Sequence, residues 1–276
     1  MVQIITDSST LFKQEETEKM GIEVLPLCVN IGDLEGRDLQ IDMDDFYGRI
    51  EAGGIPKSSQ PPIGEVMEAY EKYPDADIIN IAMADGLSGT YQTACGAKEM
   101  VDNKERITVI NSKTLCGPHR YMVEKAQKMK EAGKTAKEII AWLEKAIQSH
   151  ESFLIPQDFA FLRRGGRLTP VAAAFGSVLK LKPIMTQTKD GKRLDKYSVK
   201  RTMKHAVGAV IERLKEKKLD AKHIIYVSHA RAEEDAKKVI AQLKENFEAE
   251  IQMLELGAAF VTQGGPKCIA IQYIEK

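Results

Sequence analysis

Three arginines around a glycine pair are the side chains of this chain best suited to bind an anion. Arg163, Arg164 and Arg167 surround the glycines at 165–166, within the sequence FAFLRRGGRLTP of residues 159–170. Guanidinium groups bind carboxylates and phosphates through two parallel hydrogen bonds, and glycines let the backbone approach a ligand closely. The alternative is that the arginines are solvated cations near the end of a helix that the glycines terminate.

An apolar run continues from Val171 to Pro183. In it, alanines and a glycine leave volume beside the bulky side chains of Phe175, Val178 and Leu179. An anion site beside an apolar run with missing volume would suit an amphiphile with an acidic head group. Close packing of small residues is the structural alternative.

Loops that carry hydroxyl groups are the second set of candidate binding residues. The sequence predicts buried strands before Asp-Ser-Ser at 7–9 and before the glycine-rich turn at 84–92, and a polar loop around the serines at 58–59. A turn between a parallel strand and a helix directs backbone N–H groups and the positive end of the helix dipole toward a ligand. Ligands of such sheets bind beyond the carboxyl ends of the strands, so the three loops are expected to gather there.

The order of the predicted elements indicates an α/β fold with two domains. Strands and helices alternate up to about residue 150, which predicts an N-terminal domain, 1–150, with a parallel sheet flanked by helices. Here the pattern favours a helix over 11–20 and a strand over 22–31 that a proline interrupts. Beyond it we expect a C-terminal α/β domain, 151–276, with a mixed sheet and a hairpin that turns at Asp-Gly in two residues.

The composition argues against several classes of function. Lys+Arg and Asp+Glu number 40 each and the sequence pI is about 7.0, so neither nucleic acid nor an anionic membrane is indicated. The four cysteines include no Cys-x-x-Cys pair and the histidines lack metal-site spacing, so we expect no disulfide framework and no metal site. A signal peptide and an apolar run of about 20 residues are absent, which favours a cytoplasmic protein without membrane insertion.

Ser88 is the candidate nucleophile for an enzyme. The sequence Gly-Leu-Ser-Gly-Thr at 86–90 has half of the Gly-x-Ser-x-Gly pattern of a nucleophile elbow, but nothing in the sequence ties a histidine to Ser88. The glycine motifs of nucleotide-binding enzymes do not occur at a strand-to-helix turn. A serine-dependent enzyme acting on an acyl or phosphorylated small molecule is therefore the alternative to a binding protein.

Four motifs together resemble the bacterial DegV family of fatty-acid-binding proteins. They are Asp-Ser-Ser at 7–9, Ser-Ser-Gln-Pro at 58–61, Leu-Ser-Gly-Thr-Tyr-Gln at 87–92, and Leu-Arg-Arg-Gly-Gly-Arg-Leu at 162–168 with Leu-Lys-Pro at 181–183. Each is weak alone, but four in register along most of the chain are specific. The resemblance implies a two-domain protein that holds one long-chain fatty acid, with the acyl chain in a tunnel of the second domain and the carboxylate at the domain interface.

The resemblance also implies which residues bind the carboxylate. The hydroxyls of Ser58 and Ser88 carry over from the family, and Arg167 is the favoured arginine. The full expected set is Ser58, Ser88, Gly89, Thr90, Arg167 and Gln263, with Ser59, Arg163, Arg164 and Lys267 as second choices. The resemblance implies no catalytic residue, no metal and no cofactor.

A partner protein follows from the same resemblance. Characterised members of the family act as the acyl carrier of a fatty acid kinase system, in which a separate kinase phosphorylates the bound carboxylate. This chain would then be a lipid carrier rather than an enzyme, supplying the substrate and releasing acyl phosphate for phospholipid synthesis.

Two segments depart from the family's pattern. Where the family usually has His-x-Gly-Pro-Gly near the C-terminus, this chain has Gln-Gly-Gly-Pro-Lys at 263–267, and a glutamine forms hydrogen bonds but carries no charge. The helix expected after residue 110 begins with Cys-Gly-Pro-His-Arg at 116–120 instead of a start rich in serine and glycine. A different acidic lipid, a role without a kinase, and a regulatory protein using the arginine segment stay open as alternatives.

Overall fold

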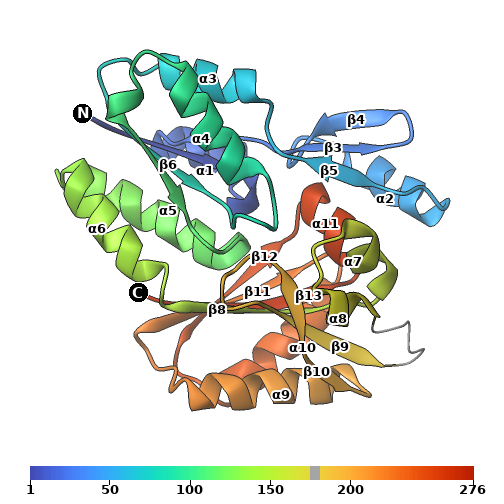
Figure 1. Cartoon of the computed structure of the whole chain (residues 1–276). Helices are drawn as coiled ribbons and strands as arrows, with labels where there is room; N and C mark the ends of the chain where they lie inside the picture. Colours follow the sequence, from blue (N-terminus) through green and yellow to red (C-terminus); the bar gives the residue numbers. More distant parts are fainter. Residues whose placement is uncertain (175–180) are drawn as a thin grey trace. The chain divides into compact units, whose positions relative to one another are not determined.

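The computed structural model describes residues 1–174 and 181–276, which form two compact units, Met1–Gln148 and Ser149–Lys276 (Figure 1). The division falls close to residue 150, where the sequence pattern changes. Both units combine helices with a sheet, which confirms the predicted α/β class. Four residues named in the apolar run lie outside the described residues: Phe175, Gly176, Val178 and Leu179.

A four-stranded parallel sheet in the order β2-β1-β6-β7 lies at the centre of the first unit. Its strands are β1 (Val2–Asp7), β2 (Glu23–Leu25), β6 (Asp77–Ala82) and β7 (Ile107–Asn111). The two central strands, β1 and β6, are buried along nearly their whole length. Because helices cover both faces, these strands read as continuous apolar runs rather than as alternating patterns.

Helices cover both faces of this parallel sheet. The first unit contains η1 (Ser8–Thr10), α1 (Gln14–Met20), α3 (Ile63–Glu71), α4 (Thr90–Met100), η2 (Lys104–Arg106), α5 (Cys116–Glu131) and α6 (Ala136–Ala146). The pair α3 and α4 lies on one face, and the pair α5 and α6 on the other (Figure 1). The helix predicted over 11–20 begins only at Gln14, because Leu11 has a left-handed backbone with φ 59°.

A second, three-stranded antiparallel sheet in the first unit was not predicted. Its strands have the order β4-β3-β5 and are β3 (Cys28–Ile31), β4 (Leu34–Arg37) and β5 (Lys57–Ser59). Helix α2 (Met43–Glu51) lies between β4 and β5 in the chain. The prediction of one interrupted strand over 22–31 was wrong: β2 and β3 belong to different sheets, since Pro26 lacks the N–H that would continue the ladder. The serines at 58–59 lie in β5 rather than in a loop.

The second unit contains the predicted mixed sheet, with six strands in the order β10-β9-β8-β13-β11-β12. They are β8 (His150–Ile155), β9 (Lys182–Gln187), β10 (Leu194–Lys200), β11 (His223–His229), β12 (Glu250–Glu255) and β13 (Ile269–Glu275). Only β11 and β12 pair in parallel. The predicted hairpin exists as β9–β10, but a bond from Thr188 N to Arg193 O closes a turn longer than two residues.

The two faces of this mixed sheet are covered differently. One face packs against α9 (Met203–Glu216) and α10 (Glu233–Lys244), which enclose most of the unit's apolar core. The described residues of this unit also form three short helices: α7 (Phe159–Gly165), α8 (Pro170–Ala174) and α11 (Ala258–Gly264). The α7/α8 cluster, which consists of Phe159, Leu162, Leu168, Ala172 and Met185, is a separate and smaller apolar group.

Candidate functional site

Asp7 joins two of the hydroxyl-bearing loops of the first unit. Its carboxylate accepts from Ser9 N at 2.9 Å and from Met83 N at 2.8 Å, so it holds the loop after β1 against the loop after β6. The Asp7 side chain is buried, with 1% of the residue exposed. The predicted gathering of these two loops at the carboxyl ends of neighbouring parallel strands is confirmed.

Ser88 lies at the start of helix α4, where its hydroxyl bonds to Thr90. The two hydroxyl oxygens are 2.8 Å apart, and Thr90 N donates to Ser88 Oγ at 3.3 Å. Ser88 is half-buried, whereas Thr90 is buried. Two hydroxyls at a helix N-terminus can donate to an anion, and the helix dipole favours negative charge there. No histidine is among the bonding partners of Ser88 in the described residues.

Strand β5 brings the serines at 58–59 to the part of the first unit that contains the Ser88 turn. Ser58 pairs with Val29 and is half-buried, whereas Ser59 is exposed, as alternation along a strand requires. The next residue, Gln60, lies with its Oε1 3.1 Å from the position that a Cβ on Gly89 would occupy. The Gln60 side chain therefore packs on the backbone of the Ser88 turn, and the absence of a side chain at Gly89 makes room for it.

His119 supports these loops from within the core, a role that the sequence did not reveal. Its Nδ1 lies 2.8 Å from Ser9 Oγ, and its Nε2 lies 3.0 Å from the carbonyl of Ile81 and 3.2 Å from Thr6 Oγ1. A proton on Nε2 donates to the carbonyl, so Nδ1 accepts from Ser9. Complete burial lowers the pKa of His119, which keeps the ring neutral. His119 thus contacts the hydroxyl of Ser9, and none of these three bonds reaches Ser88.

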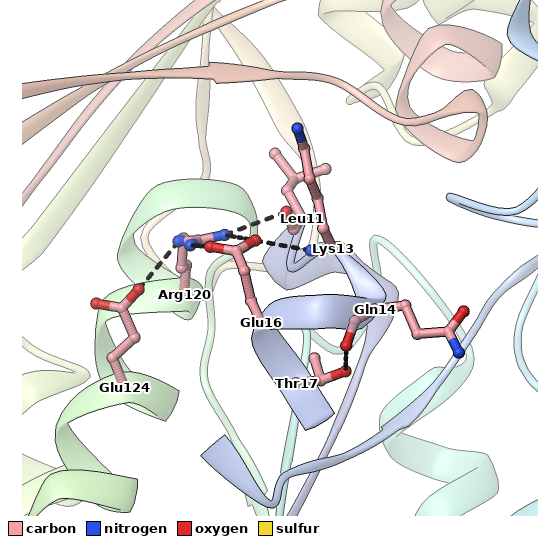
Figure 2. Close-up of polar contacts among 7 residues, drawn as sticks. All are labelled: Leu11, Lys13, Gln14, Glu16, Thr17, Arg120 and Glu124. Atoms are coloured by element: carbon pink, nitrogen blue, oxygen red, sulfur yellow. Dashed lines mark hydrogen bonds and ion pairs between the residues drawn. The ribbon is translucent and has the colours of Figure 1, made fainter. Parts of the chain in front are cut away.

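The neighbouring Arg120 holds the chain just beyond the same turn (Figure 2). Its guanidinium donates to Leu11 O at 3.1 Å, pairs with Glu16, and donates from Nε to Glu124 Oε1 at 3.0 Å. It also lies 4.3 Å from the centre of the Phe12 ring. Burial acts to raise the pKa of Glu16, but hydrogen bonds from Arg120 and from Lys13 N hold it below the ordinary value. Arg120 is therefore a structural cation.

The three arginines of the second unit differ in what they contact. Arg163 is exposed, and Arg164 is exposed with its guanidinium 4.5 Å from the centre of the Phe161 ring. Arg167 is half-buried, and its Nη1 donates to the carbonyl of Gly165 at 2.5 Å. A guanidinium has five N–H donors, so Arg167 can bind an anion while this bond persists. The preference for Arg167 over the other two stays a prediction that this geometry favours.

Gln263 and Lys267 lie in different surroundings, although they are close in the sequence. Gln263 Oε1 lies only 2.1 Å from where a Cβ on Gly165 would be, so its carboxamide packs on the glycine whose carbonyl holds Arg167. Lys267 is exposed and lines an open cleft of about 500 Å³ together with His229 and Glu255. The structure thus brings Gln263 and Arg167 together on Gly165, and it places Lys267 in a separate cleft.

Apolar side chains lie next to the arginine segment in the α7/α8 cluster. Phe159 and Leu162 of α7 and Met185 of β9 are buried there, with Leu154 and Leu194 packed against them. The short helices α7 and α8 supply this cluster, and α8 leaves Val171 74% exposed. The α7/α8 cluster thus flanks the arginine–glycine segment, with Leu162 before it and Leu168 after it.

Two negative findings concern the described parts of the chain. Within residues 1–174 and 181–276, every helix is too short or too polar to cross a bilayer. In the same ranges, His, Cys, Asp and Glu side chains do not assemble in threes or more with a geometry that could hold a metal ion.

Comparison with known proteins identifies the family. The family model described as "Uncharacterised protein, DegV family" matches residues 1–276. Protein DegV of Bacillus subtilis is 31% identical over 98% of this chain and 98% of its own length, and DegV domain-containing protein CPE0304 of Clostridium perfringens is 31% identical over 99% and 98%.

Solved structures agree with these relatives. The crystal structure of DegV from Bacillus subtilis, described as a fatty acid binding protein, superposes with a TM-score of 0.86 at 31% identity and covers 100% of this chain and 99% of that chain. A DegV family protein from Thermus thermophilus, described for its fatty acid binding, superposes with a TM-score of 0.88 at 25% identity over 100% and 99%. The resemblance seen in the four sequence motifs is confirmed, and the chain belongs to the DegV family.

Proposed function

We propose that this protein binds one long-chain fatty acid. The observation that carries the proposal is the match, over both chains' full length, to a Bacillus subtilis structure described as a fatty acid binding protein. Burial of about 15 methylene groups at roughly 0.8 kcal/mol each contributes on the order of 12 kcal/mol before the costs of association. The acyl chain therefore provides most of the affinity, and polar contacts set the position of the head group.

The carboxylate is bound, in this proposal, by hydroxyls of the first unit and by polar side chains of the second. Ser58 and Ser88 donate from the first unit, with Gly89 and Thr90 at the start of α4, where the helix dipole favours an anion. From the second unit, Arg167 and Gln263 take part, and Ser59, Arg163, Arg164 and Lys267 stay second choices. The α7/α8 cluster, continued by the apolar run, binds the acyl chain in the C-terminal tunnel expected for this family.

Two alanine variants test whether both units bind the same head group. Ser88→Ala and Arg167→Ala are each expected to weaken oleate binding by about tenfold or more, because each removes a hydrogen bond to a charged group. Binding of methyl oleate, which lacks the charge, changes little. If the two residues contact one carboxylate, the double variant loses less than the product of the single losses. Unchanged selectivity for oleate over its ester in both variants would refute the assignment.

We further propose that the protein is a carrier in a fatty acid kinase system rather than an enzyme. The Ser88 hydroxyl bonds to Thr90 and has no histidine as general base within the described residues, which disfavours the serine-dependent enzyme. A separate cytoplasmic kinase would phosphorylate the presented carboxylate for phospholipid synthesis. The oleate-loaded protein incubated with ATP is expected to give acyl phosphate only when a purified fatty acid kinase is added. Labelling of Ser88 by a serine-directed phosphonate would support the enzyme instead.

Native mass spectrometry of freshly purified protein tests the binding proposal directly. A stoichiometric adduct that organic solvent extracts and that is identified as a fatty acid would support it and give the chain length. A protein that is empty and takes up neither oleate nor palmitate would contradict it. A bound lipid with a different acidic head group would instead assign the departures at 263–267 to a change of ligand.

A further inference from the structure

Helices α7 and α11 approach each other through glycines. A Cβ on Gly165, at the end of α7, would lie 2.1 Å from Gln263 Oε1 and 3.2 Å from Gln263 Cδ. From the other side, a Cβ on Gly265 would lie 2.9 Å from Cδ2 of Phe161. Each of the two segments therefore places a side chain where the other has a glycine, and a Cβ does not come within 3.0 Å of such an oxygen or carbon atom without displacement.

The two adjacent glycines of the arginine segment are required for different reasons. Gly166 has φ 72° and open space around the position of a Cβ, so it satisfies a left-handed backbone at the end of α7. Gly165 is the last residue of the helix and has no such backbone constraint, but a Cβ there would lie 2.1 Å from Gln263 Oε1. Gly165 is needed for space, and Gly166 is needed for its backbone conformation.

We propose that Gly165 is a positioning residue for head-group recognition, acting through Gln263. The carboxamide of Gln263 reaches its place only because residue 165 has no side chain, and the carbonyl of the same residue accepts from Arg167 Nη1. One residue thus sets the positions of two side chains that bind the carboxylate. This inference rests on the proposed function, because it assigns a role to Gly165 in that same site.

The variant Gly165→Ala displaces Gln263 while keeping the charge and hydrogen-bonding groups of the protein. We expect oleate affinity to fall about tenfold, because a hydrogen bond to a charged group is lost or misdirected. Methyl oleate binding is expected to stay within about twofold, since the acyl chain is bound elsewhere. A merely structural defect would weaken both ligands alike, so this selectivity separates positioning from general destabilisation.

A double-variant cycle isolates the route through Gln263. In a Gln263→Ala background the obstruction is absent, so Gly165→Ala is expected to cause no further loss of oleate affinity and no further fall in the thermal midpoint. Gly208→Ala is the matched control, because Gly208 lies in helix α9 with open space around its Cβ position. That variant is expected to leave oleate affinity unchanged.

The outcomes separate this inference from the proposed function. Equal losses from Gly165→Ala in both backgrounds, or an unchanged oleate affinity in folded Gly165→Ala, would overturn the positioning role. A wild-type protein that binds no oleate would refute the proposed function. In that case the thermal midpoints of the cycle still test whether Gly165 and Gln263 are coupled, and additive midpoints would reject the packing argument as well.

Discussion

The two units hold their candidate binding residues by different physical means. In the first unit, buried hydrogen bonds and charges position the hydroxyl-bearing loops: Asp7, His119 and Arg120 each bond to the turn that follows β1 or to its neighbours. In the second unit, close approach at Gly165 and packing in the α7/α8 cluster position Arg167 and Gln263.

This difference predicts what disturbs each unit. A support built from buried polar groups depends on protonation and ionic strength, because burial penalises the charged form of a group that has lost its partners. A support built from shape depends on side-chain volume, because protein interiors are close-packed. The first unit should therefore respond to pH and salt, and the candidate site of the second unit to changes of volume.

The largest effect is expected from volume changes in strand β9, where two neighbouring residues face opposite sides of the sheet. Ile184 belongs to the core under α9 and α10, and Met185 belongs to the α7/α8 cluster. Ile184→Ala should lower the free energy of unfolding by about 3–4 kcal/mol, and Met185→Ala by about 2–3 kcal/mol. Urea unfolding measures both.

The loss of oleate affinity should be larger for Met185→Ala than for Ile184→Ala, the reverse of the order for stability. Met185 lies in the cluster proposed to contact the acyl chain, so Met185→Ala should weaken oleate binding. Ile184→Ala should leave oleate binding unchanged when no denaturant is present. An equal loss of oleate affinity in the two variants would contradict the assignment of separate roles to the two faces of the sheet.

The second prediction concerns pH and the first unit. His119 has a pKa lowered by burial from the ordinary value of 6.5, so the unfolded chain binds its proton at a higher pH than the folded chain does. Its neutral form therefore stabilises the fold fully above pH 6.5, and this contribution is lost as the pH falls below 6.5 toward the lower folded pKa. His119→Gln should flatten the decrease of stability measured by urea unfolding in this range.

Another histidine serves as a control for that measurement. Burial also lowers the pKa of His229, but this residue is 5% exposed against 0% for His119, so His229→Gln should flatten the profile less. A slope that is unchanged in His119→Gln would show that other groups cause the pH dependence.

The sequence predicted the regular elements and the family but not the contacts that position the site. Apolar periodicity identified the parallel strands, and four motifs identified the DegV family, because both signals are local. The sheet of β3, β4 and β5 was missed because β4 and β5 are short and carry polar residues, and because β3 was merged with β2 into one predicted strand. The partners of His119 are 38 to 113 residues away in the chain, so no local pattern could pair them.

The role of Gly165 shows a similar limit. The sequence predicted that the glycine pair lets the backbone approach a ligand closely, and it did not predict the approach of Gln263 to Gly165. A helix-terminating glycine and a glycine that makes space look alike in a sequence. His119 and Arg120 lie in the segment 116–120, which the sequence showed only as a departure from the family's pattern. The contacts by which His119 and Arg120 hold the turn after β1 depend on side-chain directions that a sequence does not show.

The third prediction tests the charged part of the first unit's support. Arg120→Met keeps much of the side chain's apolar bulk but removes the bonds to Leu11 O, Glu16 and Glu124. Because Glu16 is 39% exposed and water can replace its partner, we expect a loss of only about 1–2 kcal/mol in the free energy of unfolding. The loss should be smaller at high salt.

An exposed ion pair in the same unit is the control for Arg120. Lys134 and Glu138 form such a pair at the start of α6, and Lys134→Met should leave stability unchanged within error. Equal effects of the two variants would mean that the guanidinium is no more important than a surface cation, and the contrast between the units would then rest on Asp7 and His119 alone.

The smallest effect is expected from Lys267, the second-choice cation of the C-terminal segment. It is exposed in a cleft shared with Glu255 and the acidic start of α10, so solvent and neighbouring carboxylates screen its charge from a distant anion. Lys267→Ala should change oleate affinity by less than about twofold, against about tenfold for Gln263→Ala. Calorimetric titration of both variants measures the ratio. If Lys267→Ala gave the larger loss, recognition in the second unit would depend on charge, and the distinction between a polar support and a shape-based one would fail there.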